Sequence, residues 1–388
     1  CDASDGDPTL DEMVEEYYKA DYDILAMTDH GVITNGWTSE RETNGIFNKF
    51  RKVYPMSEEN YERITKGLDR GGRGMTDIRG GIECNMAVIS KTHVNGYFTT
   101  YGQGEWGIEN DYRTAPVEIE KAGGYSVLNH VGDWVDSGRF PHRSHWNVYI
   151  AYFAGIFIDC PSCLGMEIVN NTDRVTRGDR ELWDELLQVV IPKGRNIWAF
   201  ADDDSEKLNE VGRSFEFFVL PENNEANVKK AMKDGNFFAA SKYYKTTDGV
   251  GDFDGDGNVP LVTGIKVDQK ANTITVATDP TRDCRVIEWI ADGKVIATGN
   301  TIDLNDYEKD LGCYIRFQMK GSGGVTYSQP FELQYKGRID KPVPSWALWV
   351  FKTEAGQKFM KFYHSHSFAL GALIAEKIRI LIEDNIKK

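Results

Sequence analysis

Histidine and carboxylate residues follow short apolar segments in this sequence, and the clearest example is the stretch DYDILAMTDHG at 21–31. Its apolar residues 24–27 predict a buried parallel strand that delivers Asp29 and His30 to its C-terminal end, where α/β enzymes place their chemistry. An isolated Asp-His pair at such a position is more often a structural hydrogen-bonded pair. The interpretation therefore depends on what the other segments supply.

The same combination of an apolar segment and a ligand-type side chain recurs along the chain. Imidazole nitrogens and carboxylate oxygens are the usual ligands of zinc, manganese and iron, and a bridging carboxylate lets two such ions lie close together. Each residue taken alone is also explained by a polar group at the start of a loop. Their serial order at strand ends favours a metal cluster: Glu83 in GGIECN, His93 in KTHVNGYF, His130 in GYSVLNHVG, Glu167 in LGMEIVNN, and Asp202, Asp203, Asp204 and Glu206 in NIWAFADDDSE.

The order of these motifs resembles that of the PHP domain, the polymerase and histidinol phosphatase superfamily. The resemblance rests on TDHG, GIE, THVNG, NHVG and ADDDSE followed by VGRSF, and it covers roughly residues 1–245. It implies an α/β fold, a distorted seven-stranded (β/α) barrel, with a trinuclear metal site that hydrolyses phosphoesters. The expected partner is then a small phosphorylated substrate.

The resemblance also implies a set of metal ligands. The opening CDASDG is similar to the end of the family's first motif, which brings in Asp5, and Glu83 takes the place of the bridging carboxylate. The family's last motif usually ends in histidine, whereas this chain has Glu206, and an oxygen ligand there favours manganese, magnesium or calcium over zinc. The implied ligands of two or three manganese, zinc or iron ions are Asp5, His30, Glu83, His93, His130, Asp204 and Glu206.

The family's first motif also carries a His-x-His pair, which in this sequence would lie upstream of Cys1. Two explanations stay open: the chain is a fragment that begins just inside the first strand, or the ligands come from elsewhere. The stretch FMKFYHSHS offers His364 and His366 after an alternating apolar segment, an arrangement that would make a permuted barrel. Exposed histidines or a chance local metal clip are the plainer interpretation of that pair.

The expected chemistry follows from charge. Divalent ions lower the pKa of a bound water towards neutrality and bind phosphoryl oxygens, so hydroxide can attack phosphorus in line with the leaving alkoxide. Asp29, one residue before a ligand, is placed to orient His30. Arg177 in NNTDRVTRG and Arg213 in VGRSF follow strand ends, where a guanidinium can clamp phosphate. Surface pairing within an acidic chain is the alternative explanation for both arginines.

Two rival functions remain beside phosphoester hydrolysis. The first is a binding protein in which an incomplete cluster keeps one structural metal and the β-rich region does the recognition. The second is metal-assisted hydrolysis of a C–N bond, because such barrels resemble amidohydrolases.

Composition limits the partners. The chain has 388 residues, a net charge of −15 and a hydrophobic content of 40%, which is ordinary for a soluble protein with a large core. An acidic chain does not favour duplex nucleic acid, because that binding needs clustered lysine and arginine. Its six cysteines are too few for a disulfide scaffold, and no stretch approaches 18 uninterrupted apolar residues, so no membrane span is expected. The sequence leaves the oligomeric state open.

Periodicity divides the chain into four regions. Within residues 1–245, short apolar strands alternate with segments of helical spacing at 9–20, 179–190 and 223–235, as a parallel α/β barrel requires. The polar stretch 32–80 is typical of a substrate-shaping insertion. An Asp- and Gly-rich linker spans 246–261 and a small antiparallel β-sandwich 262–337. Residues 338–388 form a tail with an amphipathic helix.

The linker contains carboxylates at alternate positions, the spacing of a calcium loop: Asp252, Asp254, Asp256 and Asn258. An EF-hand is disfavoured because its twelfth position is Thr263 and not a bidentate glutamate. Calcium binding and a solvated turn both remain open.

Overall fold

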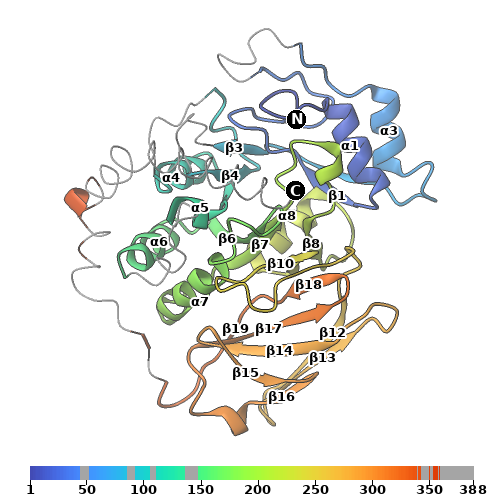
Figure 1. Ribbon diagram of the computed structural model, residues 1–388. Helices are drawn as coiled ribbons and strands as arrows, with labels where there is room; N and C mark the ends of the chain where they lie inside the picture. Colours follow the sequence, from blue (N-terminus) through green and yellow to red (C-terminus); the bar gives the residue numbers. More distant parts are fainter. Residues whose placement is uncertain are drawn as a thin grey trace, which may run out of the picture.

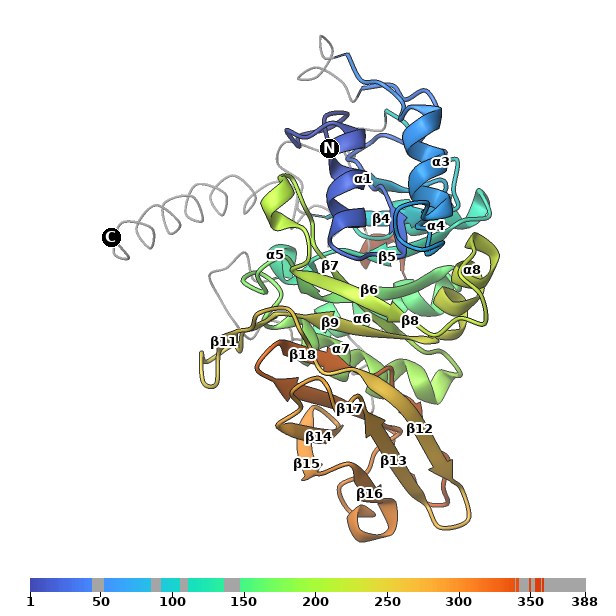
Figure 2. The ribbon, with the colours of Figure 1, turned by 90° about the vertical axis from the view of Figure 1, so that its right-hand side faces the viewer.

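The computed structural model describes residues 1–43, 52–84, 92–104, 111–135, 147–338 and a few positions between 340 and 358. Its N-terminal part is a mixed α/β structure around a partly parallel sheet, and its C-terminal part is built on antiparallel strands (Figures 1 and 2). The α/β class predicted for the N-terminal part is confirmed at this level.

The N-terminal strands alternate with helices only in part. The strands are β1 (Ile24–Ala26), β2 (Thr76–Ile78), β3 (Ile82–Cys84), β4 (Val94–Tyr97), β5 (Tyr125–Leu128), β6 (Cys163–Asn170) and β7 (Trp198–Asp202). The helices are α1 (Leu10–Lys19), α3 (Glu58–Lys66), α4 (Thr114–Lys121), α5 (Val131–Val135), α6 (Asn147–Asp159), α7 (Asp179–Val190) and α8 (Glu225–Asp234). The alternation is partial because β2 leads directly to β3 and the pairings β3-β4 and β4-β5 are antiparallel.

Local sequence explains why the predicted helices form. Thr9 and Glu12 make a reciprocal capping box at the start of α1, and the apolar residues of α1 are buried. The side chain of Asn224 caps α8, which ends at Gly235 with a φ of 72°, a conformation that glycine adopts without steric penalty. The predictions for α1, α7 and α8 are therefore confirmed. Helix α3 and strand β2 lie inside the stretch 32–80, which the sequence presented only as a polar insertion.

The strands β3 to β7 form one sheet in chain order. Pairing is antiparallel from β3 to β5 and parallel from β5 to β7, while β1 pairs with β2 in parallel. A parallel bridge between His30 and Glu83 joins the end of β1 to β3. Within the part of the chain that the structure describes, these strands do not close a barrel.

Side chains occupy the outer edge of β7. The Ala199 amide donates to Gln329 Oε1 at 2.8 Å, and Gln329 Nε2 donates to the Ala199 carbonyl at 2.9 Å. The Ala201 amide donates to Glu216 Oε1 at 2.8 Å. These bonds satisfy the backbone groups that a neighbouring strand would otherwise need to pair, which explains why the sheet ends at β7.

The remaining described strands make three antiparallel sheets. These strands are β8 (Ser214–Phe218), β9 (Phe237–Ser241), β10 (Tyr243–Tyr244), β11 (Phe253–Asp254), β12 (Val262–Asp268), β13 (Thr273–Thr278), β14 (Val286–Ala291), β15 (Lys294–Thr298), β16 (Thr301–Asp303), β17 (Tyr314–Gly321), β18 (Gly324–Tyr327) and β19 (Phe331–Glu332). The smallest is the pair β10-β11, a second has the order β12-β13-β16, and the third runs β15-β14-β17-β18-β9-β8 with β19 on β17. A shared apolar core joins the last two around Trp289 and Phe317.

The largest of these sheets includes strands from both sides of the predicted linker. Strand β9 pairs with β18 over three residue pairs and with β8 along its length, so β8 and β9 belong to the same sheet as β14, β15, β17 and β18. The β-rich region is thus attached to the N-terminal part through continuous backbone hydrogen bonds.

A buried ion pair also joins the two parts. Arg316 on β17 donates from Nε and Nη2 to the two oxygens of Asp184 on α7, at 2.7 and 2.6 Å. The Tyr314 hydroxyl donates to Asp184 Oδ1 at 2.7 Å. Because both charged side chains are almost fully buried, neither can exchange its partner for water.

We expect Arg316→Met to lower the free energy of unfolding by about 3–5 kcal/mol, because it leaves the Asp184 carboxylate buried without a counter-charge. Urea denaturation gives the value. Arg285→Met is the control, since Arg285 pairs with Asp283 on the exposed surface and its loss should change stability by at most about 1 kcal/mol. Equal losses in the two variants would contradict the role given to the buried pair.

Asp77 fixes the segment that follows β1. Its buried Oδ2 accepts a hydrogen bond from the Trp37 amide at 2.8 Å, which holds residues 31–43 against β2. Burial raises the pKa of Asp77 to about 6, although the Trp37 amide and Arg79 act in the opposite direction. Ionisation of this carboxyl therefore works against the fold near neutral pH.

Stability should depend on pH through this group. A carboxyl whose folded pKa is raised contributes stability fully below its unfolded pKa of 3.8, and this contribution is lost as the pH rises through about 6. We expect Asp77→Asn, whose amide oxygen can still accept from Trp37, to be about 1–3 kcal/mol more stable than the parent at pH 8. The gain should shrink towards pH 5 in urea titrations, and a gain independent of pH would contradict this account.

No helix among the described residues is both long enough and apolar enough to cross a membrane.

Candidate metal centre

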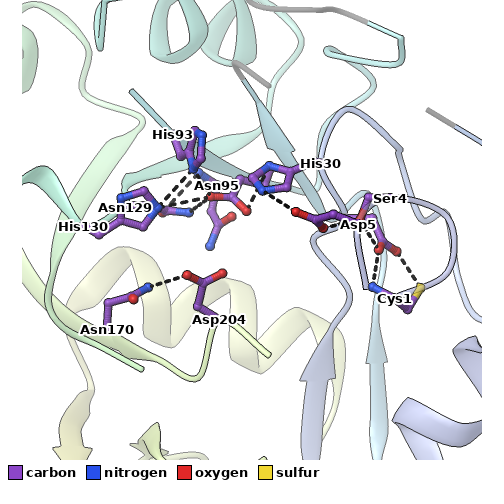
Figure 3. A network of polar contacts seen from close by, with 12 residues as sticks. Cys1, Ser4, Asp5, His30, His93, Asn95, Asn129, His130, Asn170 and Asp204 are labelled. Atoms are coloured by element: carbon purple, nitrogen blue, oxygen red, sulfur yellow. Dashed lines mark hydrogen bonds and ion pairs between the residues drawn. The ribbon is translucent and has the colours of Figure 1, made fainter. Parts of the chain in front are cut away.

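Loop positions beside neighbouring strands bring three histidines to one carboxylate. His30 follows β1, His93 precedes β4, His130 follows β5, and Glu83 lies in the middle of β3. Two backbone hydrogen bonds hold His30 beside Glu83. The Glu83 amide donates to the Asp29 carbonyl at 3.1 Å, and the Gly31 amide donates to the Glu83 carbonyl at 2.7 Å. Figure 3 shows the three imidazoles in a row, with Asn170 and Asp204 facing them across a gap.

The Glu83 carboxylate lies at the centre of this group. Its Oε2 is 3.3 Å from His30 Nδ1, and its Oε1 is 3.2 Å from His93 Nδ1 and 3.6 Å from His130 Nε2. Asn129 Nδ2 donates to the same Oε1 at 2.9 Å, which fixes the orientation of the carboxylate. Glu83 is almost fully buried, so these contacts replace its hydration.

The donor atoms are close enough to share a cation. One ligand atom each from His30, Glu83 and His93 lies within 4.8 Å of the others, and His93 Nδ1 lies 3.1 Å from His130 Nε2. Ligand atoms about 2.0–2.3 Å from one ion are separated by distances of this order. Nitrogen and carboxylate oxygen donors together suit zinc, manganese or iron, so the residues present fit the implied metal.

The charges of these groups depend on one another. Burial raises the pKa of Glu83, but His30 and His93 outweigh it and hold that pKa well below the ordinary value. Burial lowers the pKa of His30, and Glu83 and Asp5 reverse this effect and raise it. The pKa of His130 is raised to about 9, because Glu83 and Asp204 outweigh burial, whereas burial dominates at His93 and lowers its pKa. The carboxylate thus requires positive charge around it.

The remaining predicted ligands lie beside this group with more exposure to solvent. Asp5 Oδ2 is 3.6 Å from His30 Nε2, and Asp204 Oδ2 accepts from Asn170 Nδ2 at 3.2 Å. Burial and the charges of Asp5 and Asp204 raise the pKa of Glu206. The structure therefore brings all seven predicted ligands to one region, with the histidines and Glu83 in direct contact and three acids around them.

Two of the predicted ligands have strained backbones. His130 has a φ of 28° and Asp204 a φ of 49°, which are left-handed backbone values that residues other than glycine rarely adopt. Such conformations persist only where the surroundings impose them, and they concentrate at functional sites. Around His130 the constraint is visible, since its amide donates to Glu167 Oε2 at 2.5 Å.

Two supporting residues were not among the implied ligands. Glu167 belonged to the strand-end series without an assigned role, and it fixes the His130 backbone and accepts from Asn170 Nδ2 at 3.2 Å. Burial and the neighbouring Asp202 and Asp204 raise its pKa well above the ordinary value. The other supporting residue is Asn129, whose side-chain amide donates to Glu83. Its position directly before His130 in NHVG is the sequence signal that could have identified it.

Asp29 contacts a different set of residues from the one expected. Its carboxylate accepts from the Ser4 hydroxyl at 2.8 Å and from Arg41 Nη1 at 3.3 Å, and it also contacts the Cys1 thiol. Asp29 therefore anchors the segment that carries Asp5.

The two predicted phosphate-binding arginines are outside the cavity lining. Arg213 donates from Nη1 to Asn171 Oδ1 at 2.5 Å and lies 3.3 Å from Glu210 Oε1. Arg177 is half-buried and its carbonyl accepts a hydrogen bond from Arg180. Neither arginine lines the cavity described below.

The predicted calcium loop has other partners. Asp252 accepts from the Thr246 amide at 2.8 Å, Asp254 pairs with Lys245, and Asp256 accepts from the Asn258 amide at 2.9 Å. Among the described residues these carboxylates do not form a group of metal-ligand geometry. His364 and His366 lie outside the described residues.

A cavity of about 740 Å³ opens beside the candidate metal centre, and its walls include Asp5, His30, Glu83, Asp204 and Glu206. Its volume is in the range of small-molecule sites.

Comparison with known proteins adds no relative. A scan against models of known families finds no match, and a search of curated proteins finds no significant similarity.

The central position of Glu83 leads to a prediction. Glu83→Gln removes the charge that the three imidazoles surround, so we expect bound metal per chain, measured by plasma emission spectrometry, to fall by at least half. Glu15→Gln is the matched control, because Glu15 pairs with Lys19 and Arg63 on the surface away from the cavity. Unchanged metal content in the Glu83 variant would remove this residue from the site.

Proposed function

We propose that this protein is a metal-dependent phosphoesterase with a PHP-like fold. The observation that carries the proposal is the approach of His30, His93 and His130 to the buried Glu83 carboxylate at the wall of a cavity. Burying several titratable groups in one place is unfavourable unless a cation compensates their charge. Such clusters are therefore concentrated at functional sites.

The strand order supports the finer part of the proposal. Strands β2 and β1 continue through the His30–Glu83 bridge into β3 and then to β7, which makes a series of seven strands. We infer that this series is the distorted seven-stranded (β/α) barrel of the PHP resemblance, with its ligands at the strand ends.

Each group of residues has a distinct role in the proposed site. Glu83, His30, His93 and His130 would hold the metal, and Asp5, Asp204 and Glu206 would supply further oxygen ligands beside them. Divalent ions in such a site acidify a bound water and stabilise the phosphoryl charge. In the net reaction the water oxygen bonds to phosphorus, the ester P–O bond breaks, and the leaving oxygen takes a proton.

Residues behind these ligands keep them in position. Asn129 holds the Glu83 carboxylate through Oε1, and Glu167 holds the His130 backbone. Asn170 contacts both Glu167 and Asp204, so it links the two sides of the site. Partners of this kind orient metal ligands and commonly change metal affinity or activity about 10–100-fold when they are removed.

The test is phosphate release from p-nitrophenyl phosphate after removal of metal with a chelator. We expect no release by the stripped protein, recovery on addition of manganese, and a loss of at least 100-fold in kcat/KM for His93→Ala. His93→Ala is compared with Lys121→Ala, a change on the exposed surface of α4. Metal binding with no hydrolysis of phosphoesters would favour a binding protein over the proposed enzyme.

A further inference from the structure

The cavity beside the metal centre extends well beyond it. Its lining passes from His30 and Asp204 along β8 to residues of the β-rich region, namely Asp256, Gly257, Asn258 and Arg282. Ser214 begins β8 beside Asp203, one residue before Asp204, and Phe217 lies three residues further. At about 3.3 Å per residue, Phe217 is about 10 Å along the strand from the site rim. The two ends of the cavity are therefore separated by the length of a small molecule.

Aromatic rings line the wall between these ends. Tyr22 and Phe215 pack edge to face with ring centres 6.0 Å apart, and Phe215 and Phe217 do so at 5.3 Å. All three side chains are only half-buried although they line a cavity. Half-buried aromatic rings in a row are typical of surfaces that pack against flat apolar groups of a ligand.

A single guanidinium lies at the far end. Arg282 is the only lysine or arginine among the described residues that line this cavity, whose charged lining is otherwise mostly acidic. Its Cζ lies 5.6 Å from the centre of the Phe217 ring, and Nη1 donates to the Val259 carbonyl at 3.2 Å. Asp279 interacts with Arg282 electrostatically, but its carboxylate accepts hydrogen bonds from the Thr281 amide and hydroxyl, and no ion pair of Arg282 within 4 Å is found among the described residues.

The acids near this arginine do not cancel it. Asp21 and Asp23, which also line the cavity, pair with Arg70 and Arg73. Asp256 is exposed to solvent, where its charge is screened, and its carboxylate caps the Asn258 amide. Arg282 is half-buried, so an anionic group that reached it would form a charge-assisted hydrogen bond in a partly desolvated position.

We propose that the cavity is an extended substrate site in which Arg282 determines specificity. The substrate class is a phosphoester with a flat apolar body, which packs on Tyr22, Phe215 and Phe217, and a second anionic group, which Arg282 binds about 10 Å from the phosphorus. This inference rests on the proposed function for the phosphoester end, whereas Arg282 and the aromatic wall form a separate subsite.

Two aryl phosphates that differ by one carboxylate provide the test. They are 4′-carboxybiphenyl-4-yl phosphate and biphenyl-4-yl phosphate, and the carboxylate lies about 10 Å from phosphorus, the length set by β8. We expect kcat/KM to be at least about tenfold higher for the carboxylate substrate, the range of a hydrogen bond to a charged group. In Arg282→Gln this preference should disappear, while Arg285→Gln, an exposed arginine three residues away, should keep it.

Binding of the non-hydrolysable 4′-carboxybiphenyl-4-yl phosphonate, measured by calorimetry, separates this inference from the proposed function. Loss of at least about tenfold in affinity in Arg282→Gln would support the subsite even if neither ester were hydrolysed, and the phosphoesterase proposal alone would then fail. Hydrolysis of p-nitrophenyl phosphate with equal rates for the two biphenyl esters would overturn the subsite and leave the enzyme. Equal phosphonate affinity in Arg282→Gln and Arg285→Gln would also overturn the subsite.

Discussion

Burial of the Glu83 carboxylate is the constraint on which the site depends. An ionised carboxylate removed from water is very unfavourable unless positive charge and hydrogen bonds replace its hydration. Three imidazoles and the Asn129 amide meet this requirement, and they come from three separate places in the sequence. The strands β1, β3, β4 and β5 must therefore keep a fixed register, because a shift of one residue would turn a ligand to the opposite face.

The same electrostatic problem recurs on the other side of the gap. Burial raises the pKa of Glu167, Asp202 and Glu216. The charge of Asp202 adds to this effect at Glu167 and Glu216, whereas a hydrogen bond with Glu167 acts in the opposite direction at Asp202. Raised values mean that these carboxyls favour the protonated, uncharged form, while Glu83 stays charged. The site thus has one strongly ionised centre next to a set of acids that are readily neutralised, either by protons or by bound cations.

Sequence order predicted the members of the site better than their contacts. The residues His30, Glu83, His93 and His130 could be found because each follows or begins an apolar segment, and strand ends meet at a sheet edge. Asp29 could not be placed from adjacency to His30, since successive side chains on an extended backbone point to opposite faces. It therefore contacts Ser4 and Arg41.

Other features depended on pairings that the sequence does not encode locally. The segment SFEFF on β8 is aromatic on both faces, so its pattern does not identify the partner strand or predict a sheet shared with β18. The carboxylates of 252–258 have calcium-loop spacing, but spacing alone does not show that Lys245 and Thr246 lie near enough to engage Asp254 and Asp252. The sheet that β8 shares with β18 depends on a distant segment, whereas the partners of Asp252 and Asp254 lie only six and nine residues away.

The outer edge of β7 shows how the β-rich region takes part in the site. A carboxamide can donate and accept at once, as a peptide group does, so Gln329 pairs with both backbone groups of Ala199 like a residue of a neighbouring strand. Glu216 accepts from Ala201 one residue before Asp202. Because β7 leads directly into Asp204, these two side chains restrain the strand that presents a predicted ligand. The C-terminal region is therefore part of the scaffold of the candidate metal centre, and a change at the β7 edge would act on the site through the position of Asp204.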